Sequence, residues 1–146
     1  MATRSTIAKL GKDGIIKAVY CHSDGYLEHN GKVLNEYYKD ESKVDELLAH
    51  GDISFLNKNI GEKLPFNDYM LFHEKKQCRF YHRDRGEDKK EAATLKDENE
   101  LIKFATEKCD AEYIYMFAYG SWYVYDVYNG NNQFEELEEE LYVPIR

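Results

Sequence analysis

Residues 5–22 read STIAKLGKDGIIKAVYCH, and this stretch decides the fold. Its two runs, Ser5–Leu10 and Ile15–His22, are rich in the β-branched and aromatic residues that favour strands. Gly11-Lys12-Asp13-Gly14 lies between them and supplies turn-forming residues. We therefore predict a β-hairpin at the start of the chain, with the polar loop that follows Tyr20 at its end.

A second hairpin is predicted further along, where residues 112–119 and 122–128 flank Gly120-Ser121. A two-residue loop with Gly at its first position would place Tyr119 opposite Trp122 and Phe117 opposite Val124. Neither face of this hairpin is polar enough to be simply solvated. One face should cover helices, and the other should meet a ligand, another subunit or the rest of the fold.

Two helices are predicted between the hairpins. Apolar residues within 33–38 fall on one helical stripe. A second helix should run from about Lys43 to His50, with Ser42 and Asp45 as its capping box. Gly51 stands where the end of a helix favours a left-handed residue.

A third helix is predicted from about Glu98 to Lys108, because Asp97 and Glu100 again have the spacing of a capping box. It should lie on the sheet. The tail Phe134–Leu141 spaces its apolar residues for a short amphipathic helix among five glutamates. This tail could be a docked acidic segment or a surface that binds a partner.

The rest of the chain gives weaker patterns. Residues 52–66 resemble packed loop, Gln77–His82 could be a strand, and residues 83–100 are mostly charged and indicate a solvated excursion. Taken together, residues 1–146 predict a single α+β domain. We expect a mainly antiparallel sheet of about five strands with about three or four helices packed on it.

Composition excludes several classes of protein. A net charge of −8 disfavours general binding of DNA or RNA, which needs clustered Lys and Arg, although a pocket can still bind a small anion. The three cysteines, Cys21, Cys78 and Cys109, form no C-x-x-C pair and predict neither disulfides nor a structural zinc site. With no secretory leader or membrane span in the sequence, we expect a protein of a reducing cytosol that needs no cofactor and contacts no membrane.

Catalytic motifs are weak. His82-Arg83-Asp84 matches three letters of a kinase catalytic loop, but the rest of that motif set is missing. His73, Cys78 and His82 could bind zinc, yet their spacing matches no common site. Cys21 and His22 are neighbours in a predicted strand and would point to opposite faces, so they do not predict a nucleophile and its base. We therefore predict a protein that is not an enzyme.

The segment VYCHSDGY, residues 19–26, offers the best candidates for a binding site. Tyr20 and Tyr26 flank a polar run in which His22, Ser23 and Asp24 could bind a planar ligand. The Asp-Gly pair could equally be an ordinary turn, and His22 could simply bond Asp24.

Two candidates lie outside this segment. Arg4 precedes the first strand and could bind a phosphate or carboxylate, or it could be a plain surface residue. Trp122, in the second hairpin, could stack on a base.

Four segments together resemble a widespread group of small proteins encoded by tailed bacteriophages and prophages: MATRSTI (residues 1–7), YCHSDGY (20–26), NGKVL (30–34) and GDISFL (51–56). The resemblance covers chiefly the first 56 positions, and the aromatic hairpin is a looser match. Phage accessory proteins of this size include sponges, which sequester the cyclic nucleotides of bacterial immune pathways such as CBASS.

The resemblance implies a non-catalytic anti-defence protein that acts in the host bacterial cytoplasm. As a sponge it would bind a small anionic nucleotide, and as a homo-oligomer it could bury its surplus aromatic face. Two other functions stay open. The acidic surface, including the tail 135–140, could mimic nucleic acid and block a basic host defence protein, and a nucleotide-cleaving enzyme could use His22.

Overall fold

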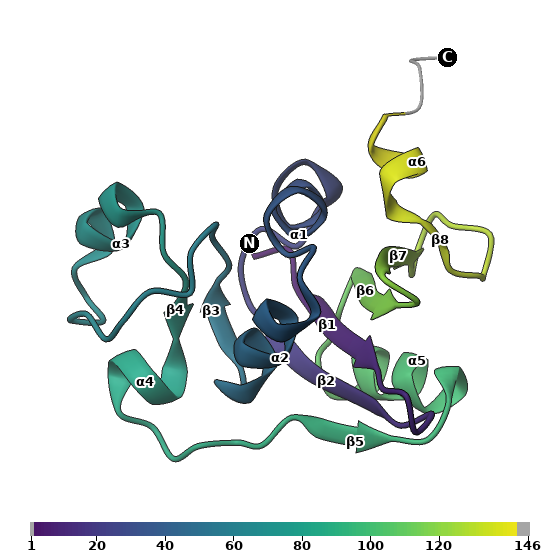
Figure 1. Ribbon diagram of the computed structural model, residues 1–146, viewed down its shortest axis with the longest axis horizontal. Coiled ribbons are helices and arrows are strands. Elements are labelled where there is room, and N and C mark those ends of the chain that lie inside the picture. Colours follow the sequence, from purple (N-terminus) through teal and green to yellow (C-terminus); the bar gives the residue numbers. More distant parts are fainter. Residues whose placement is uncertain (1, 143–146) are drawn as a thin grey trace.

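The computed structural model describes residues 2–142 (Figure 1). The strands are β1 (Ser5–Leu10), β2 (Ile16–Cys21), β3 (Ile53–Phe55), β4 (Arg79–Phe80), β5 (Ala93–Leu95), β6 (Tyr113–Ala118), β7 (Ser121–Asp126) and β8 (Glu135–Glu136). The helices are α1 (Lys32–Tyr37), α2 (Glu41–Ala49), α3 (Tyr69–Lys75), α4 (Tyr81–Arg85), α5 (Glu98–Glu107) and α6 (Leu137–Leu141), and a π-helical turn, Leu27–Gly31, precedes α1. The predicted α+β class is confirmed.

All of these strands belong to one mixed sheet with the order β4-β3-β2-β1-β6-β7-β8, and β5 pairs with β2 beside β3. In the middle of the sheet, β1 runs antiparallel to β2 and parallel to β6. Within residues 2–142, five of the seven strand pairings are antiparallel. The predicted count of about five strands was wrong because β3, β5 and β8 have only two or three residues, too few to show an alternating pattern. The possible strand Gln77–His82 forms only over Arg79–Phe80, as β4, and α4 follows it directly. The helices are also more numerous than predicted.

Both predicted hairpins form, but the second has a different register. The first joins β1 to β2, with Ile7 opposite Val19. In the second, Phe117 lies opposite Trp122, two positions from the predicted register. The reason is the loop, which is Tyr119-Gly120 with φ of +54° and +79°, a turn whose twist matches that of the strands. Because a shift of two residues keeps every side chain on its face, the predicted faces were right.

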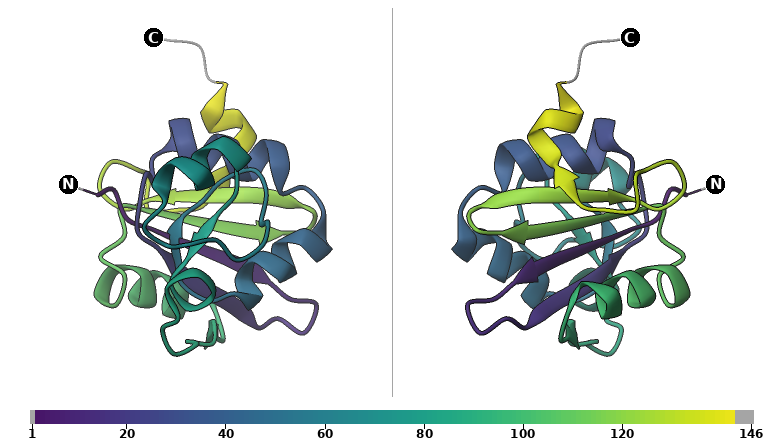
Figure 2. Two further views of the ribbon diagram at one scale, coloured as in Figure 1. Left: turned by 90° about the vertical axis from the view of Figure 1, so that its left-hand side faces the viewer. Right: turned by 90° about the vertical axis from the view of Figure 1, so that its right-hand side faces the viewer.

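The sheet has a core on each face. On one face, Ala8, Ala18 and Ile114 pack against Leu101 and Ala105 of α5. The opposite face is covered by α1, α2 and α6, whose apolar side chains pack on strand residues such as Ile7, Val19 and Tyr115. Figure 2 shows α1 and α6 on one side of the sheet and α5 on the other. The predicted helix 98–108 therefore lies on the sheet, as expected.

Most helix predictions hold, with changes at the ends. α5 begins as predicted, with the Asp97 carboxylate accepting the Glu100 amide at 2.9 Å. α2 begins two residues early, at Glu41, because Asp40 rather than Ser42 caps it. The tail forms β8 and then the short helix α6, and α3 and α4 were missed, since a run of five to seven residues gives little helical periodicity.

The segment between β3 and β5 is held by a buried ion pair, Arg83–Asp84, with 3.0 Å between Nε and Oδ1. The Asp84 carboxylate is fully buried and accepts the amides of Phe80 at 2.8 Å and Leu64 at 3.1 Å. Arg83 donates to the carbonyls of Ile60 and Cys78. Arg83 and Asp84 of the kinase-like triplet therefore have a structural role, because their contacts join distant parts of this segment.

Gly51 fixes the path of the segment that follows α4. Its φ is +76°, as predicted for a residue just after a helix. A Cβ atom at this position would lie 2.4 Å from the carbonyl oxygen of Lys90. The close approach of these two backbones therefore requires glycine.

We expect Asp84→Ala to lower the free energy of unfolding by about 3 kcal/mol, because it leaves the Arg83 guanidinium without its buried carboxylate. Glu87→Ala removes the partner of Arg85 in an exposed pair and should cost no more than about 1 kcal/mol. Urea denaturation of both variants measures the difference. Equal losses would mean that the buried pair has no special role.

We expect Gly51→Ala to cost at least about 2 kcal/mol, since it combines a left-handed backbone with a clash against Lys90. Gly14→Ala is the matched control, because Gly14 has a similar φ of +83° and open space around it. The difference in unfolding free energy between the two variants isolates the clash. A Gly51 variant no less stable than the Gly14 variant would contradict this account of the contact.

Candidate functional site

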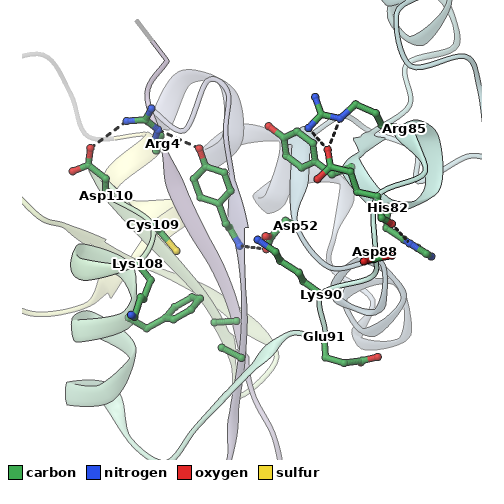
Figure 3. A pocket seen from close by; sticks show the side chains of 16 residues that line it. Arg4, Asp52, His82, Arg85, Asp88, Lys90, Glu91, Lys108, Cys109 and Asp110 are labelled. Atoms are coloured by element: carbon green, nitrogen blue, oxygen red, sulfur yellow. Dashed lines mark hydrogen bonds and ion pairs between the residues drawn. The ribbon is translucent and has the colours of Figure 1, made fainter.

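A cleft with a volume of about 840 Å³ lies beside β2, between the end of α5 and residues 85–93. Figure 3 shows Arg4, Lys108 and Cys109 on one wall, Arg85 and Lys90 on the other, and Asp52 between them. Ala18, Ala93 and the aromatic rings supply its apolar lining, and those rings belong to Tyr20, Tyr81 and Phe104.

The cleft lies where the edge of β2 is shared between two short strands. β5 pairs with residues 16–18 of β2, and β3 pairs only at Cys21. In the gap, the Tyr20 amide donates to the Asp52 carboxylate, with 3.2 Å between N and Oδ1. Asp52 thus takes the place of a strand carbonyl, and its side chain lines the cleft.

Arg4, Tyr20 and His22 form a hydrogen-bonded relay. The pairing of β1 with β2 places them on the same face, which is also the face of α5. Arg4 Nε donates to the Tyr20 hydroxyl at 3.1 Å, and that hydroxyl lies 2.6 Å from His22 Nδ1. Arg4 Nη1 also bonds Asp110 at 3.1 Å. The structure therefore brings together three of the predicted site residues.

The relay favours one form of His22. Burial lowers the pKa of His22, and the guanidinium groups of Arg4 and Arg79 lower it further. Since an arginine can only donate, the Tyr20 oxygen accepts from Arg4 and its own proton is free for Nδ1. A neutral His22 then carries its proton on Nε2.

Charges of both signs line the cleft. The cations are Arg4, Arg85, Lys90 and Lys108, and the carboxylates are Asp52, Glu87, Asp88, Glu91 and Asp110. Arg4 pairs with Asp110, and Arg85 pairs with Glu87. Burial raises the pKa of the Cys109 thiol to about 11, so this cysteine is no thiolate at neutral pH.

Ser23, Asp24 and Tyr26 lie in the loop after β2 and do not line the cleft. The loop packs closely on the start of β1, because a Cβ on Gly25 would lie 2.8 Å from that of Ser5. The Gly25 amide donates to the Thr3 carbonyl at 2.8 Å. The close packing therefore requires glycine at position 25, and Asp24 before it has a left-handed backbone with a φ of +52°.

Cys21 and Asn30 also hold this loop. Asn30 Nδ2 donates to Ser5 Oγ at 3.1 Å and contacts Cys21 Sγ at 3.4 Å, all within the core. Burial raises the pKa of the Cys21 thiol to about 12. Cys21 is thus a buried packing residue.

Trp122 lies away from the relay and is not available for stacking. It is 4% exposed, and its ring packs edge-on against Phe117. The indole Nε1 donates to the Tyr38 carbonyl at 2.8 Å on the face covered by α1 and α2. We therefore leave Trp122 out of the candidate site, because a packed core needs this large ring.

Several cleft residues were not identified from the sequence. Asp52 comes from the segment predicted as packed loop, Tyr81 from the possible strand 77–82, and Arg85 from the charged segment predicted as a solvated excursion. Arg85 lies 4.9 Å from the rings of both Phe66 and Tyr81, and Arg79 lies between Phe66 and Tyr69 at 4.5 and 4.2 Å. These contacts between arginine side chains and aromatic rings had one signal in the sequence, which is that both residue types recur within residues 66–85.

The residues considered for zinc have separate roles. Cys78 is buried and contacts the Tyr38 hydroxyl at 3.3 Å, whereas His82 Nδ1 lies 2.7 Å from the Glu87 carbonyl. In the range 2–142, His, Cys, Asp and Glu side chains form no group of three or more that could hold a metal ion.

We expect the free energy of unfolding to fall as the pH drops below about 6.5, the ordinary pKa of histidine. His22 has a lowered pKa in the folded state, so between that value and 6.5 the unfolded chain binds the extra proton. Urea denaturation at several pH values should show a smaller fall for His22→Gln, with His73→Gln, exposed on α3, as control. An unchanged pH dependence in His22→Gln would contradict the assignment.

The remaining findings concern the chain as a whole. No helix among the described residues combines the length and the apolar character that crossing a membrane requires. Comparisons of the chain with models of protein families, with curated proteins and with solved structures gave no match.

Proposed function

We propose that this chain is a non-catalytic protein that binds a small cyclic nucleotide in the cleft beside Tyr20 and sequesters it. One observation carries the proposal: a guanidinium, that of Arg4, bonds an aromatic residue, Tyr20, at the wall of a cleft of about 840 Å³. Guanidinium groups bind phosphates, and aromatic rings stack on bases. The volume is in the range of small-molecule sites.

The phosphate would bind at the wall that holds Arg4 and Lys108 (Figure 3). Arg4 is now paired with Asp110, whose side chain is 74% exposed. Exposed ion pairs contribute little free energy, so a phosphate can replace Asp110 at small cost. The base would lie against the apolar lining of Ala18 and Phe104, where Tyr20 or Tyr81 can stack on it.

Binding without cleavage is supported by the state of the reactive groups. His22 Nδ1 faces the Tyr20 hydroxyl, so this nitrogen is not free to take a proton from water. The Cys109 thiol keeps its proton at neutral pH. These contacts favour a sponge over the alternative of a nucleotide-cleaving enzyme that uses His22.

The biological setting of the proposal comes from the resemblance of residues 1–56 to small phage proteins. It would make the chain an anti-defence protein that acts in the host bacterial cytoplasm against a cyclic-nucleotide immune signal. Homo-oligomer formation is part of the proposal, because Tyr69 and Met70 of α3 are 59% and 68% exposed and a second copy could cover them.

A second candidate function rests on the acidic tail. Leu137 holds α6 in the core, and Glu138, Glu139 and Glu140 are exposed. A cluster of exposed carboxylates suits a protein that mimics nucleic acid and blocks a basic host protein.

A thermal-shift screen with cyclic dinucleotides tests the first proposal. We expect a rise in melting temperature with at least one of them, and the ligand should be intact after denaturation of the complex. Arg4→Ala should weaken binding about tenfold or more, because it removes a charge-assisted contact. Lys39→Ala changes the net charge equally at an exposed site outside the cleft and should bind normally.

Other outcomes would overturn the proposal. Release of altered nucleotide would indicate an enzyme. A chain that ignores every nucleotide but captures a basic protein in a salt-dependent way would support the mimic. Equal losses in Arg4→Ala and Lys39→Ala would place the site elsewhere.

A further inference from the structure

We propose that Asp52 recognises the base of the ligand, and that the ligand therefore carries a base with an exocyclic amino group, guanine above all. This inference rests on the proposed function and adds the chemical class of the base. It follows from the position of one carboxylate at the gap in the edge of β2.

The Asp52 carboxylate has one oxygen in use and one free. Oδ1 accepts the Tyr20 amide at 3.2 Å, which fixes the side chain against the strand. Across the described part of the chain, no hydrogen bond reaches Oδ2, and the side chain lines the cleft. Burial raises the pKa of Asp52, while the Tyr20 amide and the positive charge of Lys90 lower it. Asp52 is thus held against β2 by one oxygen, and its other oxygen can accept a hydrogen bond from a ligand.

An ionised carboxylate only accepts hydrogen bonds, so it selects bases by their donors. Guanine presents N1–H and the N2 amino group side by side, so one can donate to the free Oδ2 and the other to the second lone pair of Oδ1. Adenine and cytosine offer one amino group. Uracil has no amino group, and its single ring N–H lies between two carbonyl oxygens that a carboxylate repels.

Tyr20 determines how the ligand would lie in the cleft. Its hydroxyl bonds Arg4 and its backbone amide bonds Asp52, so the two groups stand at opposite ends of one tyrosine residue. The phosphate would bind at the Arg4 end and the base at the Asp52 end. A nucleotide bound in this way would have its phosphate and its base at opposite ends of Tyr20.

Three ligands with the same ring of phosphates and riboses test the inference: cyclic di-GMP, cyclic di-AMP and cyclic di-UMP. We expect calorimetry to show the guanine ligand bound at least about tenfold more tightly than the uracil ligand. Asp52→Asn keeps the size of the side chain and the oxygen that accepts the Tyr20 amide. It replaces the free acceptor with a donor. The variant should therefore bind cyclic di-GMP about tenfold more weakly and prefer it less strongly over cyclic di-UMP.

Glu46→Gln is the control, because it removes an exposed carboxylate outside the cleft and should leave the preference unchanged. Equal binding of the three ligands by the unmodified protein would overturn the role of Asp52 and leave the proposed function standing. That comparison needs no variant, so it decides the matter even if Asp52→Asn fails to fold. If neither these three ligands nor any other cyclic nucleotide in the screen binds, the role of Asp52 and the proposed function are both overturned.

Discussion

The parallel pairing of β1 with β6 is the contact on which the rest of the structure depends. It joins the two hairpins, which are otherwise separated by about ninety residues of chain, into one sheet. Ile7 and Ala8 are fully buried on opposite faces of β1, so both cores meet at this strand. Parallel pairing requires a long connection. The connection between the two hairpins contains α1 to α5 and the two short strands that pair with β2, which are β3 and β5.

The motif YCHSDGY divides its residues between two tasks. Cys21 and Gly25 hold the loop against the start of β1, together with Asn30. Tyr20 and His22 point to the other face and join Arg4. Because neighbouring strand residues alternate in direction, one short segment can fix the fold with one set of side chains and supply the relay with the other, of which Tyr20 also lines the cleft. Part of the distinctive composition of this segment, namely Cys21 and Gly25, is therefore explained by contacts that stabilise the fold.

The sequence predicted those features that depend on local patterns. The two hairpins, α1, α2 and α5 have clear periodicity and turn or cap residues, and they form close to the predicted positions. The relay of Arg4, Tyr20 and His22 could be anticipated because it follows from one hairpin. The cleft could not, since it depends on contacts between distant parts of the chain, such as Gly51 with Lys90. Trp122 lay on the predicted face, but the sequence did not show that helices cover this face and bury the ring.

The shared edge of β2 also affects how the protein behaves at high concentration. Within residues 2–142, no strand beyond β2 on that side is longer than three residues, and β4 ends directly in a helix. Such short segments expose too little unpaired backbone to template the addition of a strand from another molecule. The same interruption that opens the cleft therefore protects this side of the sheet from fibril-like aggregation.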